Sequence, residues 1–148
     1  MIPIYLIGVV AFVAAMVTAI SSKKAHNIDE KIGEKKSLFS TYVIVLFGMA
    51  LMTLMIDYIG ILFYFVISFA LGLINVLIND YMNQRIKTSH RVTILSIKNM
   101  GNNLAIFILF PIVGYITKIQ NMQNGFLLLT GFLVLFAIVL FFYSRKLK

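Results

Sequence analysis

The residues best suited to chemistry in this chain are one lysine and three asparagines within an otherwise apolar stretch: Lys98, Asn99, Asn102 and Asn103. They form two pairs with a spacing of four residues, so a helix would gather them on one polar face. Amide and ammonium groups can bind the polar part of a solute through hydrogen bonds and charge. The asparagine side chains are short, so they need partners from another helix, from water or from a substrate.

Lys98 has two interpretations. It lies seven residues after Arg91, about 10 Å along a helix. A lysine at the centre of a membrane-spanning helix costs roughly 2.5–3.5 kcal/mol, and its long side chain can extend to the membrane surface instead. The sequence therefore leaves open a role in a substrate path or gate and a simple reach to the interface.

A second polar stripe precedes this face and consists of Ser68, Gly72, Asn75 and Asn79. Its spacings of four, three and four residues place it on one side of a helix. Such a stripe lines a cavity, because polar groups are costly in lipid, or it packs helices closely together. The small residues at similar spacing on the first apolar segment predict a packing seam there: Gly8, Ala11, Ala15, Thr18 and Ser22.

Pro111 and Gly114 follow the asparagines in the same segment. Proline removes a backbone hydrogen bond and frees a carbonyl group, so Pro111 predicts a bend in the helix. Such a bend can serve conformational change or be purely structural.

Residue patterns of known enzymes do not occur in the sequence. It has no His-Glu-x-x-His, no Gly-x-Ser-x-Gly and no phosphate-binding loop. It also has no cysteine, and His26 and His90 lie in separate polar segments without the spacing of metal ligands. We therefore expect no enzymatic activity, no metal and no cofactor.

The elements that must position these residues are strongly apolar. Hydrophobic residues make up 61% of the chain and charged residues 12%, whereas soluble domains carry roughly 25% charge. This composition predicts an integral membrane protein. The net charge of +8 does not indicate nucleic-acid binding, because the basic residues border apolar runs.

Five apolar segments are long enough to cross a lipid bilayer as helices. We predict an all-α bundle that forms a single membrane domain over residues 1–148. The predicted helices span about residues 2–20, 38–56, 59–78, 93–116 and 125–143, with polar loops over 21–37 and 79–91 and a tight turn at Asp57 and Tyr58.

Basic residues predict the orientation of this bundle. Eleven of the thirteen Lys and Arg residues lie in the two polar loops and the C-terminal tail; Lys98 and Lys118 are the other two. Because basic residues stay on the cytoplasmic side, we expect the N-terminus outside and the C-terminus inside. Asp57 then lies in an outer hairpin, where a solvated turn residue is favoured over a proton-coupling carboxylate.

The stretch from residue 85 to 114, RIKTSHRVTILSIKNMGNNLAIFILFPIVG, resembles the penultimate helix of the major facilitator superfamily. A cytoplasmic Arg there precedes a start of the V-T-x-L-S type, and P-x-x-G closes the helix. Arg91, Ser96, Pro111 and Gly114 occupy those positions.

The first polar loop carries a second resemblance. Residues 30–35, EKIGEK, are similar to the acidic-basic-x-Gly-basic-basic loop motif of that family. The chain departs from the motif at three positions: His26 stands where the motif has Gly, Glu30 replaces Asp, and Glu34 replaces a basic residue. The resemblance implies a loop or gating role for Glu30, Lys31, Gly33, Lys35 and Arg91. The loop charges Asp29, Glu30, Lys31, Glu34 and Lys35 would form an ionic latch between helices or remain solvated.

The resemblance implies that the chain is the incomplete C-terminal half of a twelve-helix transporter and contains its last five helices. The expected function is secondary active transport of a small solute by alternating access, with drug or metabolite efflux as a narrower expectation. The missing N-terminal helices or a partner chain would complete the site and supply any proton coupling. We expect a multi-pass protein of the plasma membrane, bacterial in origin. The alternative is a small non-transporting membrane subunit with an assembly or regulatory role.

Overall fold

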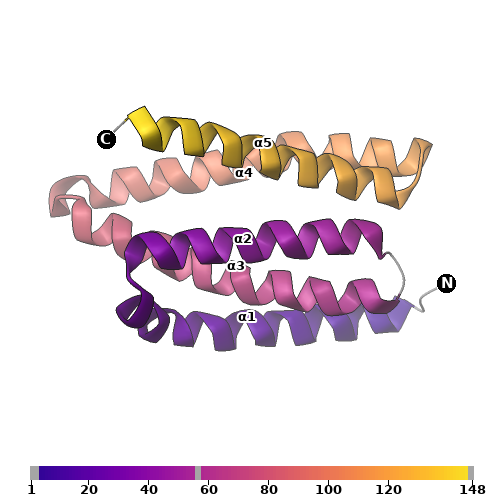
Figure 1. Ribbon diagram of the computed structural model, residues 1–148, viewed down its shortest axis with the longest axis horizontal. Coiled ribbons are helices and arrows are strands. Elements are labelled where there is room, and N and C mark those ends of the chain that lie inside the picture. Colours follow the sequence, from indigo (N-terminus) through magenta and orange to yellow (C-terminus); the bar gives the residue numbers. More distant parts are fainter. Residues whose placement is uncertain (1–3, 56–57, 147–148) are drawn as a thin grey trace.

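The computed structural model describes residues 4–55 and 58–146, with side chains for residues 5–55 and 59–139. It consists of five long α-helices and one short 3₁₀ helix (Figure 1). They are α1 (Ile4–Ile32), α2 (Glu34–Leu54), α3 (Tyr58–Arg85), η1 (Thr88–His90), α4 (Arg91–Ile119) and α5 (Met122–Lys146). All five α-helices are long and apolar enough to cross a membrane. The predicted all-α bundle of five membrane-spanning helices is thus confirmed.

The helices extend beyond the predicted boundaries, so the predicted loop over 21–37 is wrong. α1 continues to Ile32 and α2 starts at Glu34, with Gly33 alone between them. The loop predicted over 79–91 is also too long, since α3 ends at Arg85. The apolar run marks the limit of a membrane span, but Lys, Glu and Asn are compatible with a helix that continues into water. Asp57 lies outside the described residues.

Gly33 provides the reversal between α1 and α2. Its φ is +85°, a region that glycine adopts readily and residues with a Cβ atom disfavour. The Gly33 amide donates to the Asp29 carbonyl at 2.8 Å, and its carbonyl accepts from the Ser37 amide at 2.9 Å. One residue therefore ends one helix and starts the next.

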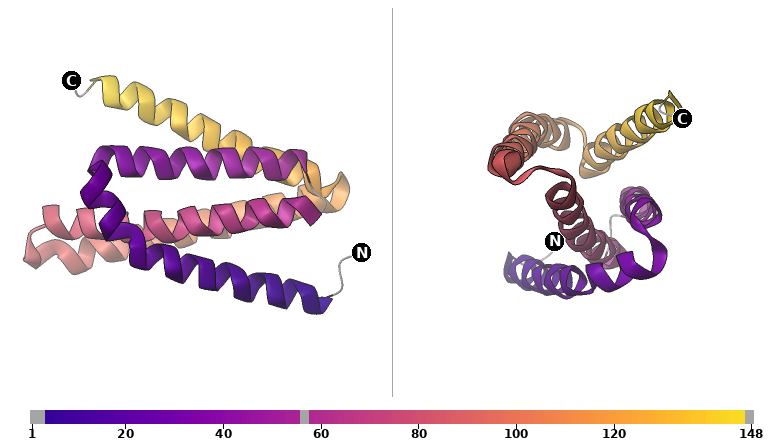
Figure 2. Two further views of the ribbon diagram at one scale, coloured as in Figure 1. Left: turned by 60° about the horizontal axis from the view of Figure 1, so that its bottom comes forward. Right: turned by 90° about the vertical axis from the view of Figure 1, so that its left-hand side faces the viewer.

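α3 is the central helix and packs against both α1 and α2, whereas α5 packs against α2 and α4 packs against α5 (Figure 2). The buried cluster consists of Ala25, Leu73, Leu77 and Tyr81. It lies toward the end of the bundle where α1 meets α2. The described residues of α4 include none that is buried, so this helix is the most open in the bundle.

The last turns of α1 run at a steep angle to the rest of that helix and cross toward the start of α2 (Figure 2). Three hydroxyl groups precede this segment. Ser21 and Ser22 both donate to the Thr18 carbonyl, at 2.9 and 2.8 Å, and Thr18 donates to the Ala14 carbonyl at 2.9 Å. Such bonds from Ser and Thr to carbonyls of the preceding turn often bend helices.

Candidate functional site

Lys98 points sideways from α4 toward α3. Its Nζ donates to Oδ1 of Asn79 at 2.5 Å, and both side chains are half-buried. Asn79 lies six residues before the end of α3, and Lys98 lies seven residues after the start of α4. Asn79 and Lys98 are thus each about 10 Å from the adjoining ends of their helices. The Lys98 amine therefore lies at about the same depth in the membrane as the Lys98 backbone.

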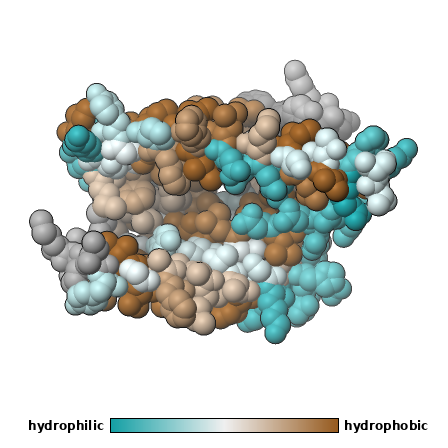
Figure 3. Space-filling view, turned by 180° about the vertical axis from the view of Figure 1, so that it is seen from behind, coloured by the Kyte–Doolittle hydropathy of each residue, from teal (hydrophilic) through white to brown (hydrophobic). Residues whose placement is uncertain are grey.

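The three asparagines of α4 are exposed. Asn99, Asn102 and Asn103 form no side-chain hydrogen bond within the described part of the chain. Together with Lys98 they form what we call the α4 polar face. Hydrophilic residues extend from one end of the bundle toward its middle in the view from behind (Figure 3), where α1 and α4 flank α3 (Figure 2).

The polar stripe on α3 divides into two parts with different surroundings. Ser68 and Gly72 are buried against α1, whereas Asn75 is exposed. Thr18 donates to the Ser68 carbonyl and Ser22 to the Gly72 carbonyl, each at 3.1 Å. The first two residues of the stripe therefore pack helices together, and only its later part is open.

Gly72 permits the closest approach in this seam. A Cβ atom there would lie 1.9 Å from Oγ of Ser21 and 2.4 Å from the Thr18 carbonyl oxygen. The predicted seam on α1 is right for Thr18 and Ser22, but Gly8, Ala11 and Ala15 are exposed. Spacing identifies a helical face, but it does not say how far along the face the neighbouring helix extends.

The loop-motif residues lie at the end of the bundle where α1 meets α2. Glu30, Lys31 and Lys35 are exposed, and Glu30 faces His26 on its own helix at 3.2 Å. Arg91 fastens the start of α4 to α3, because its Nη2 donates to the Asn83 carbonyl at 2.7 Å. Glu30, Lys31 and Lys35 thus make no ion pair to another helix in the described chain.

Contacts between helices at this end come from neighbouring residues instead. Ser37 of α2 donates to Oδ1 of Asp29 on α1 at 2.8 Å, and its hydroxyl lies 3.0 Å from that of Tyr81 on α3. Tyr81 also donates to Asp29. We call these three residues the junction cluster. Beside it, Nη2 of Arg85 on α3 pairs with Oε1 of Glu34 on α2 at 2.5 Å.

Sequence reasoning included Asp29 and Glu34 among the loop charges but missed Ser37, Tyr81 and Arg85. The missing signal was the helical state of residues 21–32. With α1 continued to its true end, Asp29 lies one turn after Ala25, on the side that faces α3. Tyr81 lies one turn after Leu77 and completes the same buried cluster.

Pro111 and Gly114 are exposed, and α4 continues through Pro111 from Arg91 to Ile119. A Cβ atom on Gly114 would meet nothing within 4 Å. Among the described residues there is also no group of three or more His, Asp or Glu side chains arranged to hold a metal ion.

The opposite side of the bundle carries an apolar groove of about 400 Å³ between α2 and α5. Its polar members are Thr53 and Thr130, whose hydroxyls lie 3.1 Å apart. Each also donates to a carbonyl of its own helix, Thr53 to Met49 at 2.8 Å and Thr130 to Phe126 at 2.9 Å. The groove therefore offers few free polar groups, in contrast to the α4 polar face.

The five long apolar helices define a multi-pass membrane protein. Compared with models of known protein families, residues 2–148 match the one described as Major Facilitator Superfamily. The chain belongs to this family, whose members are transporters, and the resemblance seen in the sequence is confirmed. Searches of curated proteins and of solved structures found no match.

Proposed function

We propose that this chain is the C-terminal part of a transporter that moves a small solute across the plasma membrane of a bacterium by alternating access. It would supply the last five helices, with its N-terminus outside and its C-terminus inside. The missing helices or a partner chain would complete the solute path and supply any proton coupling. The family match over residues 2–148 and the five spanning helices support this proposal.

The α4 polar face is the observation that carries the proposal. Exposed amides on a membrane-spanning helix are costly in lipid, so such groups face a water-filled cavity or another protein element. The helices that flank α3 on this side are α1 and α4, whereas the α2–α5 side presents an apolar groove. A solute path along α1, α3 and α4 explains why the exposed asparagines lie on this side.

Each predicted path residue has a place in this proposal. Asn75, Asn99, Asn102 and Asn103 would face the path, and Lys98 would border it from its bond to Asn79. Ser68 and Gly72 would support the path from behind by holding α3 against α1. An efflux direction and a drug-like or metabolite solute are the narrower parts of the proposal.

Replacing Asn102 and Asn103 together with Leu tests the path. Cells that express the chain are compared with cells that lack it, and the small solutes whose cellular content differs are identified by mass spectrometry. We expect N102L/N103L to abolish most of this difference, because Leu cannot hydrogen-bond a solute or water. Abundance of the protein in the membrane is measured in parallel.

Leu104→Met is the matched control, since Leu104 is an exposed α4 residue about 160° from Asn102 and about 100° from Asn103 around the helix. This variant should keep the full difference. A solute profile that is the same with and without the chain would contradict transport and favour a non-transporting membrane subunit. A profile that survives N102L/N103L would show that these amides only pack.

A further inference from the structure

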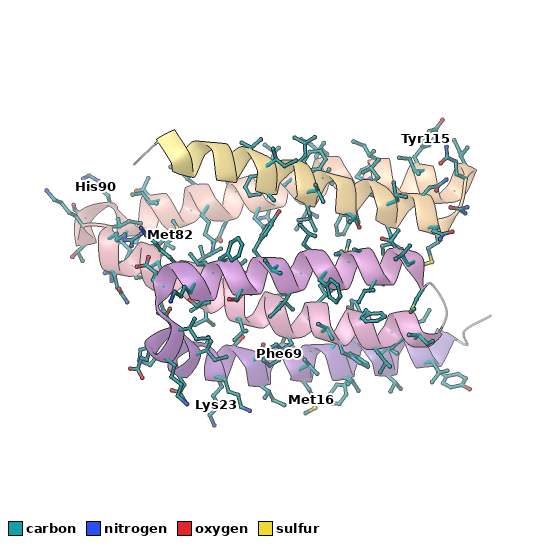
Figure 4. The ribbon with its side chains drawn as sticks, viewed as in Figure 1. Met16, Lys23, Phe69, Met82, His90 and Tyr115 are labelled. Atoms are coloured by element: carbon teal, nitrogen blue, oxygen red, sulfur yellow. The ribbon has the colours of Figure 1, made fainter. Side chains whose placement is uncertain are left out.

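Five lysines gather on the last turns of α1 and the first turn of α2. All of them are exposed, and we call them the lysine surface: Lys23, Lys24, Lys31, Lys35 and Lys36. Gly33 holds the two short helical stretches next to each other. Lys23 extends away from the bundle, on the side opposite α3 (Figure 4).

The carboxylates in this segment are engaged by other groups. Asp29 accepts hydrogen bonds from Ser37 and Tyr81, turned toward α3. Glu30 faces His26 at 3.2 Å, and Glu34 pairs with Arg85 at 2.5 Å. None of the five lysines forms an ion pair or a side-chain hydrogen bond with another described residue. Their charge therefore remains available for an external anion.

The segment that carries Lys23, Lys24 and Lys31 lies where the bilayer headgroups would be. α1 has 29 residues, whereas about 20 suffice to cross the hydrocarbon. The excess is the end that runs at a steep angle across the bundle (Figure 2). Ala25 and Ile28 hold this end against α3, so its lysines project outward at the level of the membrane surface.

We propose that the lysine surface binds the phosphate groups of anionic phospholipids in the adjoining leaflet. Clusters of four to eight basic residues immediately next to a membrane-spanning helix are typical of such binding. Ammonium groups bind phosphate as point charges, and the attraction is screened by salt. This role is independent of the solute path, which lies on other residues.

Spin-labelled lipids test the proposal on the full chain. The protein is reconstituted into phosphatidylcholine vesicles that contain a trace of spin-labelled phosphatidylglycerol or spin-labelled phosphatidylcholine. The fraction of each label that the protein immobilises is measured by electron paramagnetic resonance. We expect a preference for phosphatidylglycerol of about threefold at low salt, falling toward one in about 1 M NaCl.

Three variants assign the preference to the lysine surface. Changing all five lysines to Gln (K23Q/K24Q/K31Q/K35Q/K36Q) should remove it, whereas changing all five to Arg should keep it because the charge remains. Lys118→Gln, near the end of α4, should also keep it. Circular dichroism checks that helix content is unchanged in each variant.

Three results would each overturn the proposal. The first is that the wild-type chain shows no preference for phosphatidylglycerol, and the second is that the five-Gln variant retains the preference. The third is that the preference does not change with salt. The last result would indicate a contact that does not depend on lysine charge.

Discussion

Gly72 shows how much of this fold depends on single atoms. Changing it to Ala places a Cβ atom 1.9 Å from Oγ of Ser21 and 2.4 Å from the carbonyl oxygen of Thr18, so α1 and α3 must separate. We expect Gly72→Ala to lower the free energy of unfolding by about 1–3 kcal/mol. Unfolding in mixed micelles of increasing denaturing detergent, followed by circular dichroism, measures the change.

Gly101→Ala is the control for that experiment. Gly101 lies in α4, and a Cβ atom there would meet nothing within 4 Å. Alanine is the better helix former by about 1 kcal/mol, so this variant should be neutral or more stable. Equal stability of both variants would mean that α1 and α3 do not approach each other this closely.

At the residue scale, the spacing of the polar residues predicted which of them share a helical face. It did not predict whether another helix or open space lies next to that face. The spacing of Ser68, Gly72 and Asn75 is regular, and yet the first two are buried against α1 and the third is exposed. The neighbour of a helical face depends on how the helices cross, and spacing within one helix contains no information on this. Lys98 illustrates the same point, because its partner Asn79 comes from another helix.

At the element scale, the junction cluster joins three helices at the end where α1 meets α2. Tyr81 is 7% exposed and its hydroxyl contacts Ser37 and Asp29. Tyr81→Phe removes these bonds and leaves the carboxylate with one donor fewer, which should cost about 1–3 kcal/mol. Hydrogen–deuterium exchange should become faster in residues 25–37 and change little in α4 and α5.

Tyr115→Phe provides the comparison, because the Tyr115 side chain is 67% exposed and lies far from the junction cluster (Figure 4). Its exchange pattern should match that of the wild type. If Tyr81→Phe also left residues 25–37 unchanged, the cluster would not be what holds the end of α1 in place.

The helices themselves were predictable because each span is a long apolar run, whereas their ends were not. Hydropathy falls where a helix leaves the membrane, but α1 and α3 continue past that point into polar sequence. The junction cluster was missed for this reason. Ser37 lies 8 residues after Asp29 and 44 residues before Tyr81, and only continued helices bring the three residues together.

At the scale of the whole molecule, the α4 polar face and the α2–α5 groove lie on different sides of one bundle. The α4 polar face is exposed, the α2–α5 groove is apolar, and the lysine surface lies at one end. In a chain of the major facilitator superfamily, this arrangement fits the proposed solute path along α1, α3 and α4. The family match supports the class of function, while the path depends on whether water reaches the α4 polar face.

Cysteine labelling in the membrane measures this directly, since the chain has no cysteine of its own. Asn102→Cys and Leu104→Cys are treated in turn with a membrane-impermeant maleimide, with Lys118→Cys, at an exposed position near the end of α4, as the reference. Maleimides react with the thiolate, which forms in water and is suppressed in apolar surroundings. We predict that Asn102→Cys reacts at least about tenfold faster than Leu104→Cys. Equal rates at these two α4 positions, or no reaction at Asn102→Cys, would contradict a water-filled path along this helix.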